Sequence, residues 1–163
     1  MGEELVFMNT NTLDVDIRHD LGTPLSEVIR TTTIQTMPVH DTSSPRQTKP
    51  VLFVADADSV LRRGLIAALK RRFGADYLVH SAATSEAGLR TLRRLHDEAA
   101  EVALVIADLW LPDTGGVEFL GQARECYPRA QCIVLTTIGD EAVTESLQRA
   151  LALGQVDRFV EKP

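Results

Sequence analysis

The stretch VLFVADADS at residues 51–59 decides the fold, because an apolar run passes directly into an acidic loop. A continuous apolar run of this kind is typical of a strand that is buried on both faces of a sheet. Asp56 and Asp58 follow the run, and alanines interrupt the acids. A metal-dependent phosphoryl site calls for adjacent carboxylates at such a strand end. The stretch therefore predicts a buried strand, and the loop is a working site, an altered one or an ordinary turn.

Apolar runs and amphipathic segments alternate through the rest of the chain. Alternation of strands and helices predicts a parallel sheet with helices on both faces. We therefore expect an α/β fold with a doubly wound, five-stranded parallel sheet. Thr84 or Ser85 is expected near the start of the second helix, and Gly154 at the end of the fourth. The expected strands are 51–55, 77–79, 102–107, 132–136 and 158–161. The first expected helix is 59–72, the second contains residues 87–95, the third contains residues 117–123 and stops before Pro128, and the fourth contains residues 143–151.

The chain divides into three parts. Residues 36–49, TMPVHDTSSPRQTK, are rich in Pro, Ser and Thr and lack an apolar period, so we predict a linker. The linker separates an N-terminal segment, residues 1–35, from a sheet-forming domain at residues 50–163. Within the N-terminal segment, residues 13–30 have apolar side chains at helical spacing and predict an amphipathic helix.

Composition and charge narrow the class of protein. The chain has 163 residues, of which 44% are hydrophobic and 25% are charged, as in an ordinary globular protein. A net charge of −6 argues against direct nucleic-acid binding through a basic face. No apolar run approaches the ~20 residues of a membrane span, and the N-terminus does not resemble an export signal. We expect a cytoplasmic protein that binds neither nucleic acid nor membrane.

Polar side chains follow several of the predicted strands. In a doubly wound sheet, chemistry gathers at the carboxyl ends of the strands, near the topological switch point. A carboxylate there can attack phosphorus, neighbouring carboxylates can hold Mg²⁺, and a hydroxyl and an ammonium can bind phosphoryl oxygens. Each residue alone has an ordinary structural explanation, so the prediction depends on the whole set. That set is Asp56, Asp58, Asp108, Thr136, Thr137 and Lys162.

Three motifs resemble those of one protein family. The stretches IADLWLPDTGGVEFL (106–120), IVLTT (133–137) and FVEKP (159–163) resemble the receiver domain of bacterial response regulators. The resemblance covers residues 50–163 and implies a flavodoxin-like sheet with strand order 2-1-3-4-5. The family has one more helix after the fifth strand, and we expect it to be missing because the sequence stops at Pro163.

The resemblance implies a role for each residue that matches the motifs. Asp108 corresponds to the phosphoacceptor, and Lys162 to the ammonium that pairs with the phosphate. Trp110 corresponds to the residue whose backbone carbonyl binds the metal. Thr136 and Phe159 correspond to the hydroxyl and the aromatic ring that switch on phosphorylation. Any enzymatic activity would be at most self-phosphorylation and self-dephosphorylation of the aspartate.

The acidic loop departs from the family, whose members carry two adjacent acids after the first strand. Asp56 takes the place of the first acid, and Ala57 replaces the second, which normally binds the metal directly. A shift of one residue would make Ala55 the missing acid instead. Asp56 and Asp108 remain as carboxylate ligands, so we expect Mg²⁺ binding that is weakened but not abolished. Asp58 is a further candidate ligand if its side chain turns inward.

The N-terminal stretch HDLGTPL (19–25) resembles the H-box of sensor histidine kinases, where a histidine accepts a phosphoryl group from ATP. His19 would be that histidine. No second dimerisation helix and no glycine-rich ATP lid follow in the sequence, so the chain is not a complete kinase. The segment is a phosphohistidine site, a remnant of a hybrid histidine kinase, or an ordinary amphipathic helix with an exposed histidine.

We expect a receiver module that accepts a phosphoryl group from a sensor histidine kinase or phosphotransfer protein. It would signal by contact with a downstream protein, and a homodimer is one possible state. The main alternative is a degenerate receiver that binds its partners without phosphorylation. A relay fragment that uses both His19 and Asp108 is another. A haloacid-type phosphatase would need a second aspartate where Trp110 stands.

Overall fold

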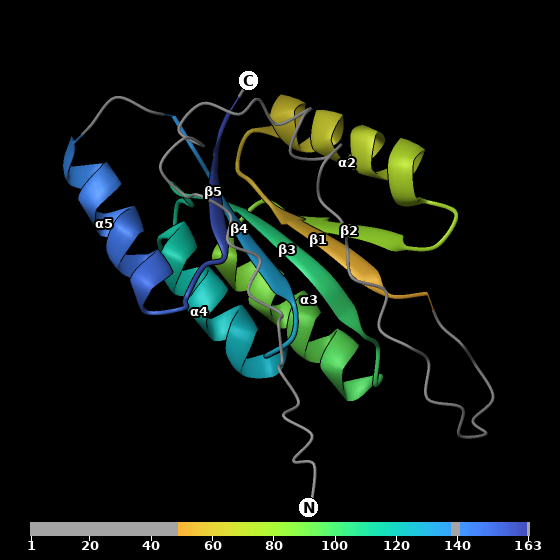
Figure 1. Ribbon diagram of the computed structural model, residues 1–163. Helices are drawn as coiled ribbons and strands as arrows, with labels where there is room; N and C mark the ends of the chain where they lie inside the picture. Colours follow the sequence, from red (N-terminus) through yellow and green to blue (C-terminus); the bar gives the residue numbers. More distant parts are fainter. Residues whose placement is uncertain (1–48, 138–140, 163) are drawn as a thin grey trace, which may run out of the picture.

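Figure 1 shows the computed structural model, which describes residues 49–137 and 141–162. Within these residues, the strands are β1 (Val51–Ala55), β2 (Leu78–Ala82), β3 (Val102–Asp108), β4 (Gln131–Thr136) and β5 (Arg158–Glu161). The helices that connect them are α2 (Ser59–Phe73), α3 (Ser85–Asp97), α4 (Gly116–Cys126) and α5 (Glu141–Ala152). The elements thus alternate along the chain as the sequence predicts.

The strands form one sheet in the order β2-β1-β3-β4-β5, and every neighbouring pair is parallel. This confirms the doubly wound α/β fold with the flavodoxin-like order. The strand order reverses between β1 and β3, where Ala55 pairs with Ala107. The residues that follow this pair are Asp56 and Asp108, so the register places both at the topological switch point.

Helices cover both faces of the sheet: α2 lies on one face, and α3, α4 and α5 lie on the other (Figure 1). Successive side chains of a strand point to opposite faces, so each strand feeds two apolar cores. In β1, Val51, Phe53 and Ala55 belong to the core that includes side chains of α3 and α4, whereas Leu52 and Val54 pack with α2. All five are at most 1% exposed, which explains the unbroken apolar run.

The ends of two helices follow from local chemistry. Thr84 caps α3, because its Oγ1 accepts a hydrogen bond from the backbone N–H of Ala87 at 3.2 Å. Gly154 follows α5 with a φ of +67°, a left-handed conformation that glycine adopts at little cost. Both residues therefore act where the sequence predicts a helix boundary.

The second strand is longer than predicted and begins later. We expect residues 77–79 from the sequence, whereas β2 spans Leu78–Ala82. His80 and Ser81 carry polar side chains, so no apolar run marks this part of the strand. In the described sheet β2 is an edge strand that pairs with β1, and half-exposed strands do not need the apolar pattern of central ones.

The predictions for the N-terminal segment, for His19 and for the linker up to residue 48 lie outside the described residues. The domain boundaries therefore remain predictions. None of the helices in the described ranges has the length and apolarity needed to cross a membrane.

Candidate functional site

Three charged side chains meet at the carboxyl edge of the sheet. Asp56 directly follows β1, Asp108 ends β3, and Lys162 directly follows β5. The Lys162 ammonium lies 2.9 Å from Oδ2 of Asp108 and 3.2 Å from Oδ2 of Asp56. The parallel topology thus brings two aspartates that are far apart in the sequence to one shared counter-ion.

This cluster is almost closed to solvent, since Asp56 is 0% exposed, Asp108 is 5% exposed, and the side chain of Lys162 is 17% exposed. Burial raises the pKa of Asp56 and outweighs the lowering effects of the Asp58 amide and the Lys162 charge. Burial acts to lower the pKa of Lys162, but the contacts with Asp108 and then Asp56 outweigh it and raise that pKa. The ammonium therefore stays charged at neutral pH. Because burial disfavours the charged form of Asp56, a further cation close to this carboxylate would stabilise that form.

Backbone N–H groups orient both carboxylates. Oδ1 of Asp56 accepts a hydrogen bond from the Asp58 amide at 2.7 Å, and Oδ1 of Asp108 accepts one from the Trp110 amide at 3.2 Å. Oδ2 of Asp56 is buried and has no hydrogen-bond partner in the described part of the chain. Lys162 Nζ makes an ion pair with this oxygen at 3.2 Å. A buried carboxylate oxygen without a hydrogen bond, beside a second carboxylate, suits a hard cation.

The donor set fits a Mg²⁺ ion that takes few ligands from the protein. The candidate ligands are Asp56, Asp108 and the backbone carbonyl of Trp110. Mg²⁺ is usually bound by one or two carboxylates, with water and phosphate oxygens filling the other positions. Across residues 49–137 and 141–162, no group of three or more His, Cys, Asp or Glu side chains could hold a metal. No third side chain of these types therefore joins Asp56 and Asp108 in the described conformation.

The Asp58 side chain is placed at a helix end and not in the charged cluster. It is the N-cap of α2, where Oδ1 accepts hydrogen bonds from the amides of Val60 at 2.7 Å and Leu61 at 3.1 Å. The bond from Leu61, followed by that from Val60, holds the pKa of Asp58 below its usual range. An inward turn toward a metal would remove this cap. Its role as a substitute metal ligand stays a prediction.

The two alanines of the acidic loop differ in position. Ala55 is the last residue of β1, fully buried, and pairs with Ala82 on one side and Ala107 on the other. Ala57 lies beyond the strand and is exposed. An acid at position 55 would lie inside the core, whereas an acid at position 57 would lie at the strand end beside Asp56. This placement supports position 57 as the site of the missing acid.

The residues expected to switch lie near the same edge. Thr136 ends β4 and is 2% exposed, and its hydroxyl donates only a long hydrogen bond, 3.4 Å, to the Thr137 carbonyl. The carbonyl of Thr136 accepts a hydrogen bond from the Lys162 amide at 2.8 Å, which ties β4 to the charged cluster. Phe159 is partly buried and packs against the core that includes side chains of α3, α4 and α5. Whether these side chains switch stays a prediction.

The loop after Asp108 packs closely against the backbone of that residue. A Cβ atom added to Gly116 would lie 2.0 Å from the carbonyl oxygen of Asp108, so a side chain does not fit there. The amide of Gly116 donates a hydrogen bond to the Leu109 carbonyl at 2.9 Å and closes the loop. Trp110 projects from it with 65% of its surface exposed. The glycine therefore allows the helix to begin directly beside the candidate phosphoacceptor.

Two residues that hold the loops of this edge are missed by the sequence analysis. Arg62 donates from Nη1 to the carbonyl oxygen of Asp56 and, at 3.5 Å, to that of Ala57. Asp113, in the loop before α4, accepts hydrogen bonds from backbone amides of α3. Both bind backbone groups that only the folded chain brings near, so residue type and spacing give no signal for the contact.

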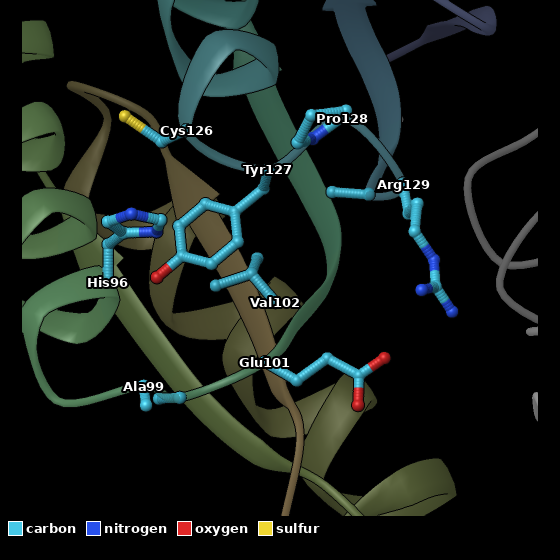
Figure 2. A pocket seen from close by; sticks show the side chains of 10 residues that line it. His96, Ala99, Glu101, Val102, Cys126, Tyr127, Pro128 and Arg129 are labelled. Carbon is cyan, nitrogen blue, oxygen red and sulfur yellow. The ribbon is translucent and has the colours of Figure 1, made fainter. Parts of the chain in front are cut away.

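A surface hollow of about 460 Å³ lies at the opposite end of the sheet, where β3 begins and the chain enters β4. Figure 2 shows the ring of Tyr127 beside His96 at its centre. The two rings meet edge to face with centroids 5.6 Å apart, and the Tyr127 hydroxyl donates to the Leu92 carbonyl. The hollow contains none of the charged residues of the carboxyl edge, so it is not the candidate phosphoryl site.

Comparisons with known proteins identify the family. A family model described as "Response regulator receiver domain" matches residues 52–163. The sensor kinase CckA of Brucella abortus (strain 2308) is 30% identical to this chain over 113 residues. That match covers 69% of this chain but only 11% of the kinase. The chain thus corresponds to a small part of that relative's length.

Solved structures share the fold. A CheY-like receiver domain protein from Methanospirillum hungatei JF-1 has a TM-score of 0.57 and 22% identity, covering 71% of this chain and 83% of that chain. The chemotaxis protein CheY4 of Vibrio cholerae has a TM-score of 0.57 and 23% identity, covering 71% and 88%. A response regulator from Burkholderia pseudomallei, solved with a phosphorylated aspartic acid, calcium and citrate, has the same TM-score of 0.57 at 23% identity, covering 71% and 61%. At these identities the structures support the fold alone.

The family match extends over most of the chain and includes the whole charged cluster. Asp56, Asp108 and Lys162 all lie within the matched residues 52–163. The strand order and the three motifs at residues 106–120, 133–137 and 159–163 agree with this family. This chain therefore belongs to the response regulator receiver domain family.

Proposed function

We propose that this chain is the phosphoacceptor module of a phosphorelay and that Asp108 accepts the phosphoryl group. The observation that carries the proposal is the Lys162 ammonium, which lies 2.9 Å from Asp108 at the topological switch point. A buried lysine shared by two aspartates brings little stability, because burying three charges costs about as much as their pairing returns. As a fixed positive charge beside a nucleophile, however, it suits the developing charge of phosphoryl transfer.

The transfer step needs an activated donor, such as the phosphohistidine of a partner kinase or phosphotransfer protein. A carboxylate oxygen of Asp108 attacks phosphorus, and an O–P bond forms as the P–N bond of the donor breaks. The donor nitrogen keeps the electron pair of the broken bond and takes up a proton. The products are an aspartyl phosphate and a neutral histidine. Lys162 would pair with oxygens of the transferred group.

The residues that would hold Mg²⁺ are Asp56, Asp108 and the carbonyl of Trp110. Bound there, the ion supplies positive charge that offsets the charge on the phosphoryl oxygens. Since Ala57 provides no ligand, we expect weaker binding than a site with two adjacent acids would show. The raised pKa of Asp56 adds to this effect, because protons compete with the metal for that carboxylate as the pH falls.

The signal would leave the site through side-chain rotation. The hydroxyl of Thr136 is held only by a 3.4 Å hydrogen bond, so it can turn toward a phosphoryl group at little cost. The half-buried ring of Phe159 could then change its rotamer and alter the nearby surface. A downstream protein in the cytoplasm would read that surface, and the receiver could act as a monomer or a homodimer.

Intact-mass measurement after exposure to acetyl phosphate and Mg²⁺ tests the proposal. The parent chain should gain one phosphoryl group, and Asp108→Asn should gain none. Asp97→Asn is the matched control, because it removes an exposed acid at the end of α3, away from the site. Equal labelling of Asp108→Asn and the parent would place the acceptor elsewhere. A silent parent with a labelled Ala57→Asp variant would identify a degenerate receiver that lost its metal ligand.

A further inference from the structure

Asp113 fastens two loops together at the carboxyl edge of the sheet. It lies in the 109–115 loop, between β3 and α4. Its Oδ1 accepts a hydrogen bond from the Ser85 amide at 2.9 Å, and its Oδ2 accepts one from the Glu86 amide at 2.7 Å. In return, the Ser85 hydroxyl donates to the carbonyl of Thr114 at 2.8 Å. These hydrogen bonds join the loop that follows the phosphoacceptor to the first turn of α3.

This contact is distinct from the ordinary cap of α3. Thr84 caps the helix from within and satisfies the amide of Ala87, whereas Asp113 takes the amides of Ser85 and Glu86 from across the fold. Hydrogen bonds from backbone amides, of which that from Glu86 has the largest effect, lower the pKa of Asp113 to about 2. Asp113 is therefore ionised at neutral pH, and its hydrogen bonds to the helix N-terminus are charge-assisted.

The first half of the same loop meets the phosphoacceptor. The amide of Trp110 donates to Oδ1 of Asp108 at 3.2 Å, and the next residue, Leu111, is only 7% exposed. The Trp110 carbonyl thus belongs to a short stretch held by Asp108 at one end and by Asp113 at the other. Only two residues, Leu111 and Pro112, separate Trp110 from Asp113.

We propose that Asp113 is a positioning residue of the metal site, which sets the place of the Trp110 carbonyl relative to Asp108 by holding the 109–115 loop against α3. The inference rests on the proposed function, because that carbonyl is a ligand only if Mg²⁺ binds there. Since Ala57 supplies no carboxylate, the carbonyl provides a larger share of the protein ligands than at a site with two adjacent acids. Its position therefore matters more in this chain.

The test compares two charge-removing variants of the full chain. Asp113→Asn keeps the size of the side chain but loses the charge and one accepting oxygen. Glu118→Gln removes the same charge from the first turn of α4, where the side chain is exposed to solvent. The first readout is hydrogen exchange of the Trp110 amide without metal. The second is a Mg²⁺ titration followed by the fluorescence of Trp110, the chain's single tryptophan.

We expect Asp113→Asn to speed exchange at Trp110 as well as at Ser85 and Glu86, and to weaken Mg²⁺ binding about tenfold, as for residues that orient metal ligands. Glu118→Gln should leave the Mg²⁺ affinity within about twofold of the parent, because an exposed charge has a weak effect. If Asp113→Asn does not fold, Asp113→Ser is measured in its place, because the serine hydroxyl retains one hydrogen-bond acceptor.

Faster exchange confined to Ser85 and Glu86, with an unchanged Mg²⁺ affinity, would overturn the inference and leave Asp113 as a cap only. An equal loss of affinity in Glu118→Gln would overturn it as well, since charge alone would then explain the effect. A parent chain that binds no Mg²⁺ would count against the metal site of the proposed function. Exchange at Trp110 would still decide whether Asp113 positions the loop.

Discussion

The substitution Gly116→Ala should damage both the fold and the site. An added Cβ would lie 2.0 Å from the carbonyl oxygen of Asp108, 2.8 Å from its carbonyl carbon and 3.0 Å from Cα of Leu109. All three are backbone atoms, which cannot rotate away as a flexible side chain can. We expect a loss of about 3 kcal/mol in the free energy of unfolding, at the upper end of the range for overpacked cores.

Two other glycines of the same region serve as matched controls. Neither Gly115 nor Gly121 has an atom within 4 Å of an added Cβ. Gly115→Ala should cost at most about 1 kcal/mol in the free energy of unfolding, because the position is open and its φ is negative, and the loss comes from replacing glycine at the N-cap of α4. Gly121→Ala lies inside α4 and should stabilise the chain by about 0.5–1 kcal/mol through helix propensity.

Urea unfolding measures these differences, and acetyl phosphate labelling measures their effect on the site. With a slope of about 1–3 kcal/mol per molar urea, Gly116→Ala should lower the unfolding midpoint by about 1–3 M. The clash also displaces the backbone of Asp108, so labelling should fall roughly 10- to 100-fold, as for a misplaced nucleophile. A Gly116→Ala chain as stable and as readily labelled as Gly115→Ala would refute this reasoning.

Three further predictions concern the charged cluster. Ala57→Asp should tighten Mg²⁺ binding about tenfold by adding a hard oxygen ligand, and an unchanged titration curve would contradict the assignment of the missing acid. Asp56→Asn should raise the urea midpoint at pH 7, because the pKa of this buried carboxyl lies above its ordinary value of 3.8 and its ionised form therefore destabilises the folded state. The gain in urea midpoint should shrink as the pH falls from 7 toward 3.8, because Asp56 then becomes protonated and neutral in the folded chain. A gain that persists below pH 3.8 would count against the effect of burial. Lys162→Met should slow labelling of Asp108 by about 100-fold through loss of the fixed positive charge, whereas Lys70→Met, on the exposed side of α2, should leave the rate unchanged.

Much of the fold follows from the sequence because its central strands are buried on both faces. The apolar run at 51–55 coincides with β1. The alternation with helices predicts the parallel sheet, and the resemblance to the family implies the order of its strands, which the structure confirms. The edge strand β2 is the exception, because its polar residues His80 and Ser81 are placed by pairing with β1 and not by an apolar pattern. Edge strands have one free side, so their sequences carry a weaker signal.

The charged cluster could be predicted for the same topological reason. Parallel strands place their carboxyl ends at one edge, so Asp56, Asp108 and Lys162 were expected to meet, and the structure brings them within ion-pair distance. The direction of individual side chains could not be predicted. An aspartate after a strand serves equally well as a metal ligand or as a helix cap, and only the folded loop turns Asp58 toward the amides of α2.

The contacts of Arg62 and Asp113 lie further beyond sequence reasoning. Arg62 binds carbonyl oxygens six and five residues before it, and Asp113 binds amides 28 and 27 residues before it. Backbone groups are the same at every position, so the identity of a residue does not show which of them its side chain will meet. Such contacts become visible only when the loops are in place.

The central claim is that Asp108 carries the phosphoryl group, and the most direct test is to locate that group on the chain. Borohydride reduces an aspartyl phosphate to homoserine, so labelled protein can be reduced, digested and sequenced by tandem mass spectrometry. We predict homoserine at position 108 after labelling with acetyl phosphate and Mg²⁺, and aspartate at positions 56 and 58. Homoserine at either of those positions, with Asp108 unmodified, would contradict the assignment of the phosphoacceptor.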